Sequence, residues 1–254
     1  TSSLQAWYFS RIASTFGYVV EKGPSEWIVF PAGGPHDERL GYPRIPALAE
    51  RLDSIGFELT HQARMTPSLL RWMSRGALPI YADKGPTGLT VHDRAGIPLV
   101  DERDPRYAYE DFDSIPEVVW RTLLQIESQG LLDSGGSRRN PAVEWDRFAL
   151  SALRLAMREL GSSQGVPGGS TLATQIEKYR HSPGGITDSP REKLRQMLGA
   201  SLRAYSRGPH TYEQRRRTIT EFLNSVPLAG QVGFGEVVGL GEGLWAWYGT
   251  PFEH

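Results

Sequence analysis

The chain of 254 residues contains no cysteine, which excludes a disulfide framework, thiol catalysis and metal sites with cysteine ligands. Its six histidines are scattered and form no short metal-binding pattern, so the sequence predicts no metal site. No run approaches the roughly 18 apolar residues that a membrane-spanning helix needs. The formal net charge of -1 gives no overall attraction to nucleic acid, and nucleic acid is not expected as a partner.

The composition is that of an ordinary globular protein, with 39% hydrophobic and 22% charged residues. Such a chain buries a substantial core as one large domain or as a domain with a smaller companion. Residues 178–217 hold ten Lys or Arg and three acids, a basic stretch that we interpret as solvated helix faces. Because the chain starts without Met and ends on PFEH, we expect it to be one module of a longer protein.

The N-terminal third mixes strand and helix signals. One helix is expected after Pro46, and another at Thr66, a plausible N-cap before a proline. Residues 89–100 read as two short strands around a turn. We expect residues 1–88 to form a small α+β accessory region, and no motif within it indicates a chemical function.

From Ser114 on, the sequence becomes helical. Three helix starts carry capping-box patterns, in which a hydroxyl residue precedes Glu or Gln by three positions: Ser114 with Glu117, Ser189 with Glu192, and Thr211 with Gln214. Between them, residues 133–141 (DSGGSRRNP) look like a flexible linker. The fold class predicted for residues 89–254 is mainly α.

One helix has a polar stripe after a glycine-rich entry at Gly168 and Gly169. Its apolar face is expected to hold Leu172, Ile176 and Tyr179, and its polar stripe to hold Thr171, Thr174, Gln175 and Lys178. Backbone donors at the positive end of such a helix suit a phosphate or another anion. The alternative is a capped surface helix whose polar face meets water.

This segment, GGSTLATQIEK, resembles the signature GGSTITQQxxK of glycosyltransferase family 51, found in penicillin-binding proteins and monofunctional peptidoglycan polymerases. Four other segments follow the family's order: DRAGIPLVDE, IPEVVWRTLLQIES, REKLRQMLGASLRAY and RRRTITEFLNSVPLAG. The resemblance covers about residues 89–249. It implies a lysozyme-like glycosyltransferase domain at the outer face of the bacterial cytoplasmic membrane, where lipid II is polymerised into glycan strands.

The resemblance also implies roles for single residues. Glu127 matches the glutamate expected to act as general base on the acceptor hydroxyl, and Lys178 matches the lysine expected to hold the donor pyrophosphate. The other substrate-binding residues that it implies are Gly169, Ser170, Thr171, Gln175, Arg180, Lys193, Gln196 and Asn224.

Several positions depart from the family pattern. Ser128 replaces the Asp of a Glu-Asp pair, Leu131 replaces a Phe, and Ser134 stands where a His is expected. Thr174 occupies a Gln position, and Gln196 replaces a Glu that would polarise a sugar hydroxyl or bind a divalent cation. No cofactor follows from the sequence, although the resemblance leaves a divalent cation open.

Three functions fit these residues. The first is an active glycosyltransferase that takes an undecaprenyl-pyrophosphate-linked disaccharide. The second is a catalytically inactive scaffold or module that binds glycan or lipid II. The third is a lysozyme-like hydrolase, with Asp133 or Glu144 as its second carboxylate. The partners expected are lipid II or the nascent glycan strand, the membrane surface through a segment outside this sequence, and other cell-wall or membrane proteins.

Overall fold

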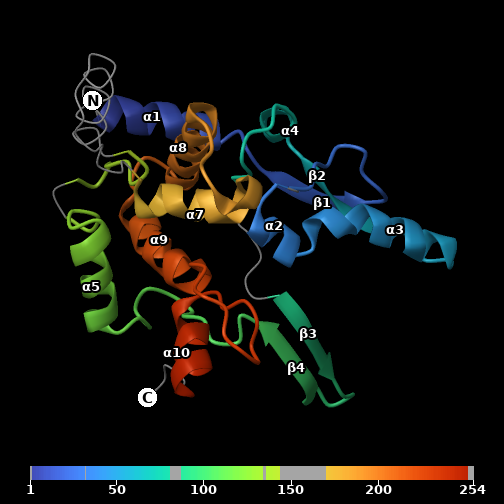
Figure 1. Cartoon of the computed structure of the whole chain (residues 1–254). Helices are drawn as coiled ribbons and strands as arrows, with labels where there is room; N and C mark the ends of the chain where they lie inside the picture. The colour runs from blue at the N-terminus through green and yellow to red at the C-terminus, as the bar shows by residue number, and fades with distance from the viewer. Residues whose placement is uncertain (1, 32, 81–86, 134–135, 144–169, 251–254) are drawn as a thin grey trace.

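The helix with the glycine-led motif, α7 (Leu172–His181), lies at the centre of the fold between α8 (Pro190–Ala204) and α9 (Tyr212–Ser225) (Figure 1). The computed structural model describes residues 2–31, 33–80, 87–133, 136–143 and 170–250. In this part of the chain, α7 packs against both neighbouring helices, which cover two of its sides.

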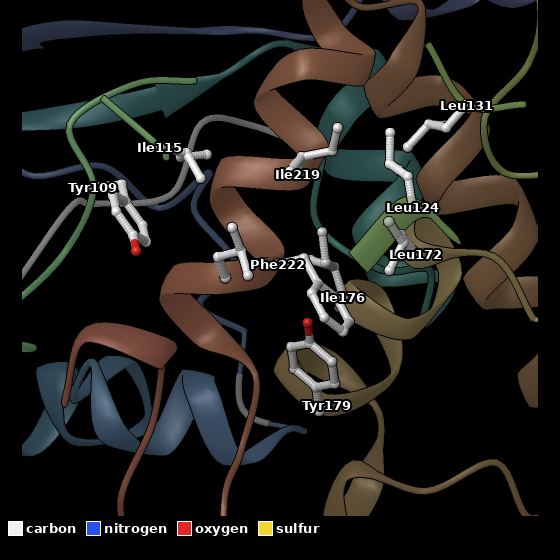
Figure 2. Packing of buried hydrophobic residues seen from close by; sticks show 10 residues of the cluster. Tyr109, Ile115, Leu124, Leu131, Leu172, Ile176, Tyr179, Ile219 and Phe222 are labelled. Atoms are coloured by element: carbon white, nitrogen blue, oxygen red, sulfur yellow. The ribbon is translucent and has the colours of Figure 1, made fainter. Parts of the chain in front are cut away.

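The main hydrophobic core forms where α7 meets α9 and α5 (Glu117–Glu127). Figure 2 shows its side chains converging from these helices. The predicted apolar face of α7 is confirmed, because Leu172, Ile176 and Tyr179 all belong to this core. The buried residues that complete the core are Tyr109, Ile115, Leu124, Leu131, Ile219, Phe222 and Leu223.

The predicted polar stripe on α7 is wrong for its first two residues, and so is the alternative that this face meets water there. Thr171 and Thr174 are buried, because they cap the helix start: the Thr174 amide donates to Thr171 Oγ1 at 3.3 Å, and the Thr171 amide donates to Thr174 Oγ1 at 2.9 Å. Of the ten residues in α7, only Gln175 and Lys178 are not buried. The helix is therefore a core helix with one narrow open face, not a capped surface helix.

Glu177 and Arg180 of α7 are buried as well, and each is paired with a different element. Glu177 Oε1 accepts from Arg203 Nε of α8 at 2.7 Å, and Arg180 Nη1 donates to Glu221 Oε2 of α9 at 3.3 Å. The interpretation of the basic stretch as solvated is therefore wrong for Arg180 and Arg203, and also for Arg215, which is fully buried.

The N-terminal region packs on these helices through α1 and α2. Its elements are α1 (Ser2–Ala13), β1 (Tyr18–Lys22), α2 (Pro35–Arg39), η1 (Tyr42–Arg44), α3 (Ile45–Ser54), β2 (His61–Met65) and α4 (Pro67–Ser74). The rings of Phe9 in α1 and Tyr205 after α8 stack with centroids 6.0 Å apart. The expected helices after Pro46 and Thr66 are present as α3 and α4, and Thr66 accepts from the Leu69 amide as the predicted cap.

The two predicted strands around residues 93–96 form an antiparallel hairpin of β3 (Thr87–His92) and β4 (Pro98–Asp104). Asp93 Oδ1 shapes its turn by accepting from the amides of Ala95 and Ile97, both at 2.8 Å. In the described part, β1 and β2 form the other two-stranded sheet, so the fold is mainly α as predicted.

Two of the three predicted capping boxes differ in the structure. Ser189 does cap α8, accepting from the Glu192 amide at 3.1 Å. Ser114 lies before the start of α5 and instead donates to the Asp111 carbonyl at 2.8 Å. Thr211 precedes α9, but its hydroxyl donates to the Arg139 carbonyl at 2.6 Å. The same residue types serve loop contacts here, because a spaced pattern does not specify which backbone group the hydroxyl reaches.

The last helix, α10 (Leu240–Tyr248), ends the described chain beside α9 (Figure 1). In the described part of the chain, no helix combines the length and apolar character required to cross a membrane.

Arg215 of α9 holds the loop that follows α5. Its Nη1 donates to the carbonyls of Leu131 at 2.7 Å and Asp133 at 3.3 Å, and its Nη2 donates to that of Gly136 at 3.1 Å. Burial is the largest cause that lowers the pKa of this guanidinium, with Arg139 as a second cause. The segment predicted to be a flexible linker is thus tied to the helical core on both sides of residues 134–135.

Replacing Arg215 with Ala is expected to lower the free energy of unfolding by about 3 kcal/mol, because one buried and two part-buried carbonyls lose a charged donor. Urea unfolding followed by circular dichroism measures the change. Arg217→Ala, two residues along the same helix at an exposed position, is the control and is expected to stay within about 0.5 kcal/mol of the parent chain. Equal effects of the two substitutions would contradict the role of Arg215.

Candidate functional site

Glu127, the predicted general base, is the last residue of α5, and it contacts α7 directly. Gln175 Nε2 donates to Glu127 Oε2 at 3.0 Å, joining two residues 48 positions apart in the sequence. The Glu127 side chain is half-buried. In the described part of the chain, Oε2 is the oxygen of Glu127 that accepts a hydrogen bond, and Gln175 holds it.

Lys178 follows Gln175 by three positions on the same open face of α7. Among the described residues it has no acid within ion-pair distance. Lys193 of α8 lies close enough for the Lys178 charge to lower its pKa, although burial is the larger cause. Lys193 Nζ donates to Ser170 Oγ at 2.7 Å, just before the α7 N-terminus. Ser170 and Lys193 thus place a hydroxyl and an ammonium group at the entry of α7, and the charge of Lys178 acts on Lys193, a combination that suits an anion.

Several of the predicted substrate-binding residues contact other parts of the protein. Thr171 is buried as the α7 cap. Arg180 is buried against α9, where its Nη2 donates to Ser225 Oγ at 3.1 Å besides its ion pair with Glu221. Asn224 holds the backbone of Tyr109 from both sides, accepting from its amide and donating to its carbonyl at 2.8 Å each.

Gln196 is also buried, within a polar network at the end of α7. Its Nε2 donates to Ser182 Oγ at 3.0 Å and to Thr187 Oγ1 at 2.9 Å. Ser182 Oγ in turn donates to a carboxylate oxygen of Glu192, which also binds Arg195. Position 196 carries no acid, but the Ser182 hydroxyl connects Gln196 to the carboxylate of Glu192. The amide of Gln196 donates to the hydroxyls of both Ser182 and Thr187.

Some predicted positions are buried, and others lie outside the described residues. Ser128 and Leu131, which depart from the family pattern, are buried after α5. Gly169, Ser134 and Glu144 lie outside the described residues. Asp133, the other carboxylate of the hydrolase reading, pairs loosely with Arg139 at 3.9 Å.

Several contacts that organise the site were not predicted. They are the buried pairs of Glu177 with Arg203 and of His181 with Asp37, and the carbonyl contacts of Arg215. A signal existed for Arg215, because it shares a helical face with Ile219 and Phe222 at spacings of four and seven. No comparable pattern marks Asp37, which is 144 residues away from its partner.

These features define a mainly α domain in which Gln175 and Lys178 lie on the open face of the central helix α7, with Glu127 of α5 bound to Gln175 and Lys193 of α8 near Lys178. Residues 97–254 match a family model described as transglycosylase. Since this match spans more than half of the chain, the chain belongs to the transglycosylase family. The family supports a peptidoglycan glycosyltransferase-like function in the cell envelope and confirms the resemblance seen in the sequence. A search of curated proteins finds no match.

Replacing Lys178 with Met is expected to raise the pKa of Lys193, because a neighbouring positive charge that disfavours its protonated form is removed. The shift is measurable by an NMR titration of the Lys193 side chain. Arg191→Met removes an exposed charge from the first turn of the same helix and serves as the control. A Lys193 pKa that does not change in Lys178→Met would show that the two ammonium groups are not neighbours.

Proposed function

We propose that this chain is a peptidoglycan glycosyltransferase domain that binds an undecaprenyl-pyrophosphate-linked disaccharide (lipid II), with Glu127 as general base and Lys178 on the donor pyrophosphate. The observation that carries the proposal is the hydrogen bond from Gln175 to Glu127. It links the carboxylate to the same helix face that presents Lys178, so base and cation are held by one rigid element.

In the proposed reaction, an acceptor sugar hydroxyl attacks the anomeric carbon of the donor and inverts its configuration. Glu127 takes the proton of this hydroxyl through its other oxygen, Oε1, while Oε2 stays bound to Gln175. A carbon–oxygen bond forms at the anomeric carbon as the bond to the pyrophosphate oxygen breaks. The proton ends on Glu127 and the electron pair on the leaving diphosphate.

Side chains of α7 and α8 are suited to stabilise the negative charge that develops on the diphosphate. Lys178 and Lys193 are neighbouring cations, and their mutual repulsion in the empty site is relieved when an anion binds between them. Ser170 adds a hydroxyl next to Lys193. Because negative charge on the diphosphate grows toward the transition state, these cations stabilise the transition state more than the ground state. This difference is what lowers the barrier of the reaction.

We also propose that the domain works at the outer face of the bacterial cytoplasmic membrane, since a lipid-linked donor is held there by its polyprenyl chain. Lipid II or the growing glycan strand is then the partner in the site. We propose that four of the predicted residues support this site without contacting the substrate, because their polar groups already bind other protein groups. They are Asn224, Gln196, Arg180 and Thr171.

Glu127→Gln is expected to reduce glycan polymerisation at least about 100-fold, because the amide cannot accept the acceptor proton. The rate is measured with purified protein, labelled lipid II and a divalent cation. Glu117→Gln is the matched control: it removes a carboxylate from the exposed first turn of the same helix and is expected to retain the parental rate. A Glu127→Gln variant as active as Glu117→Gln would exclude Glu127 as the base.

The same assay separates the enzyme from an inactive binding module. The buried amide at Gln196, in place of an acid, is the observation that favours such a module. Lipid II binding without product by the parent chain, unaffected by Glu127→Gln but weakened by Lys178→Ala, would establish the module and reject the enzyme.

Gln175→Met is expected to lower kcat roughly tenfold with little change in KM, because it removes one hydrogen bond that orients Glu127 while leaving Lys178 in place. Steady-state kinetics with lipid II measures both constants. Gln125→Met on the exposed side of α5 is the control. An effect on KM alone would show that Gln175 contacts the substrate and does not act through Glu127.

A further inference from the structure

The segment before α2 approaches the end of α7 more closely than a side chain allows. A Cβ atom added to Gly34 would lie 2.0 Å from the Arg180 carbonyl oxygen and 2.5 Å from His181 Cα. A Cβ on Gly33 would lie 3.1 Å from the His181 carbonyl oxygen. Because real Cβ atoms do not approach a carbonyl oxygen to 2.0 Å, the backbone at Gly34 meets α7 directly, with no room for a larger residue.

Asp37 fixes this approach with both of its carboxylate oxygens. Oδ1 lies 2.8 Å from His181 Nδ1, and Oδ2 accepts from the Gly34 amide at 3.2 Å. Both Asp37 and His181 side chains are 1% exposed. A hydrogen bond to a carboxylate at such low exposure is shielded from water, so this side chain joins the start of α2 firmly to the last residue of α7.

The residue held in this way belongs to the helical turn that carries Lys178. His181 follows Lys178 by three positions, and the Ser182 amide donates to the Lys178 carbonyl at 3.1 Å. On the other side, the Ser182 hydroxyl is bound to Glu192 and Gln196. The turn from Lys178 to Ser182 is therefore held by α8 on one side and by Asp37 on the other.

We infer that Asp37 is a positioning residue of the donor site: through His181 it fixes the last turn of α7 and thereby the place of Lys178 beside Lys193. The inference rests on the proposed function for its link to lipid II. It assigns a role to the region before residue 97, which lies outside the family match and for which the sequence indicated no chemistry.

The test compares Asp37→Ala with Asp37→Asn and with Glu38→Ala, which removes an exposed carboxylate from the next position. In Asp37→Ala, KM for lipid II is expected to rise about tenfold with kcat changed less than about twofold, because donor binding suffers and Glu127 does not. Asp37→Asn keeps an oxygen for His181 and is expected to restore KM to within about threefold of the parent chain. Glu38→Ala is expected to behave as the parent chain.

An NMR titration of Lys193 gives a readout that needs no activity. Loss of the Asp37 charge acting through space would lower the Lys193 pKa, whereas displacement of Lys178 away from Lys193 would raise it. A raised pKa in Asp37→Ala, absent in Asp37→Asn and Glu38→Ala, is therefore the expected signature.

The outcomes separate this inference from the proposed function. If the parent chain makes no glycan but Asp37→Ala raises the Lys193 pKa, the proposed function fails and the positioning role stands. If the parent chain polymerises lipid II and Asp37→Ala alters neither KM nor the Lys193 pKa, the positioning role is overturned alone. Should Asp37→Ala not fold, Asp37→Ser takes its place, because its shorter side chain loses the carboxylate that contacts His181. A raised KM with a raised Lys193 pKa supports the role, and parental values of both contradict it.

Discussion

The arrangement depends on three buried side chains of α7, Glu177, Arg180 and His181, and on a partner for each of them. A charged or polar group without a partner is costly in a protein interior, so Glu177, Arg180 and His181 tolerate burial only where partners meet them. Those partners come from three directions, on α8, α9 and α2. Together they fix the rotation of α7 about its axis, and this rotation leaves Gln175 and Lys178 on the open face. The pairs therefore orient the site as much as they hold the fold.

Family motifs and helical periodicity predicted the mainly α fold, the core face of α7 and the elements that carry Glu127 and Lys178. Periodicity failed where polar residues are buried. Thr171 and Thr174 have the spacing of a water-facing stripe, yet their hydroxyls serve the helix cap. A pattern of polar residues indicates that they need hydrogen bonds, but it does not indicate whether water, a substrate or the same helix supplies them.

Long-range pairs set the other limit on prediction. Asp37 and His181 are each unremarkable in sequence, and only the fold shows that they meet. The role of Arg215 was easier to predict, because an arginine on an apolar helix face needs hydrogen-bond acceptors within the protein. Here the acceptors are the carbonyls after α5. The domain division at residue 88 stays a prediction, although Arg203 of α8 donates to the carbonyl of Pro79 at 2.6 Å across it.

The close approach at Gly34 has a consequence for how the molecule divides. The family match starts at residue 97, but the surface that α7 turns toward Gly34 and Asp37 is shaped to receive backbone, not water. Excising the chain at that point would strip His181 of its buried carboxylate and lay bare the carbonyl ends of the central helix. The unit of sequence similarity and the unit that folds around α7 are thus different lengths of the same chain.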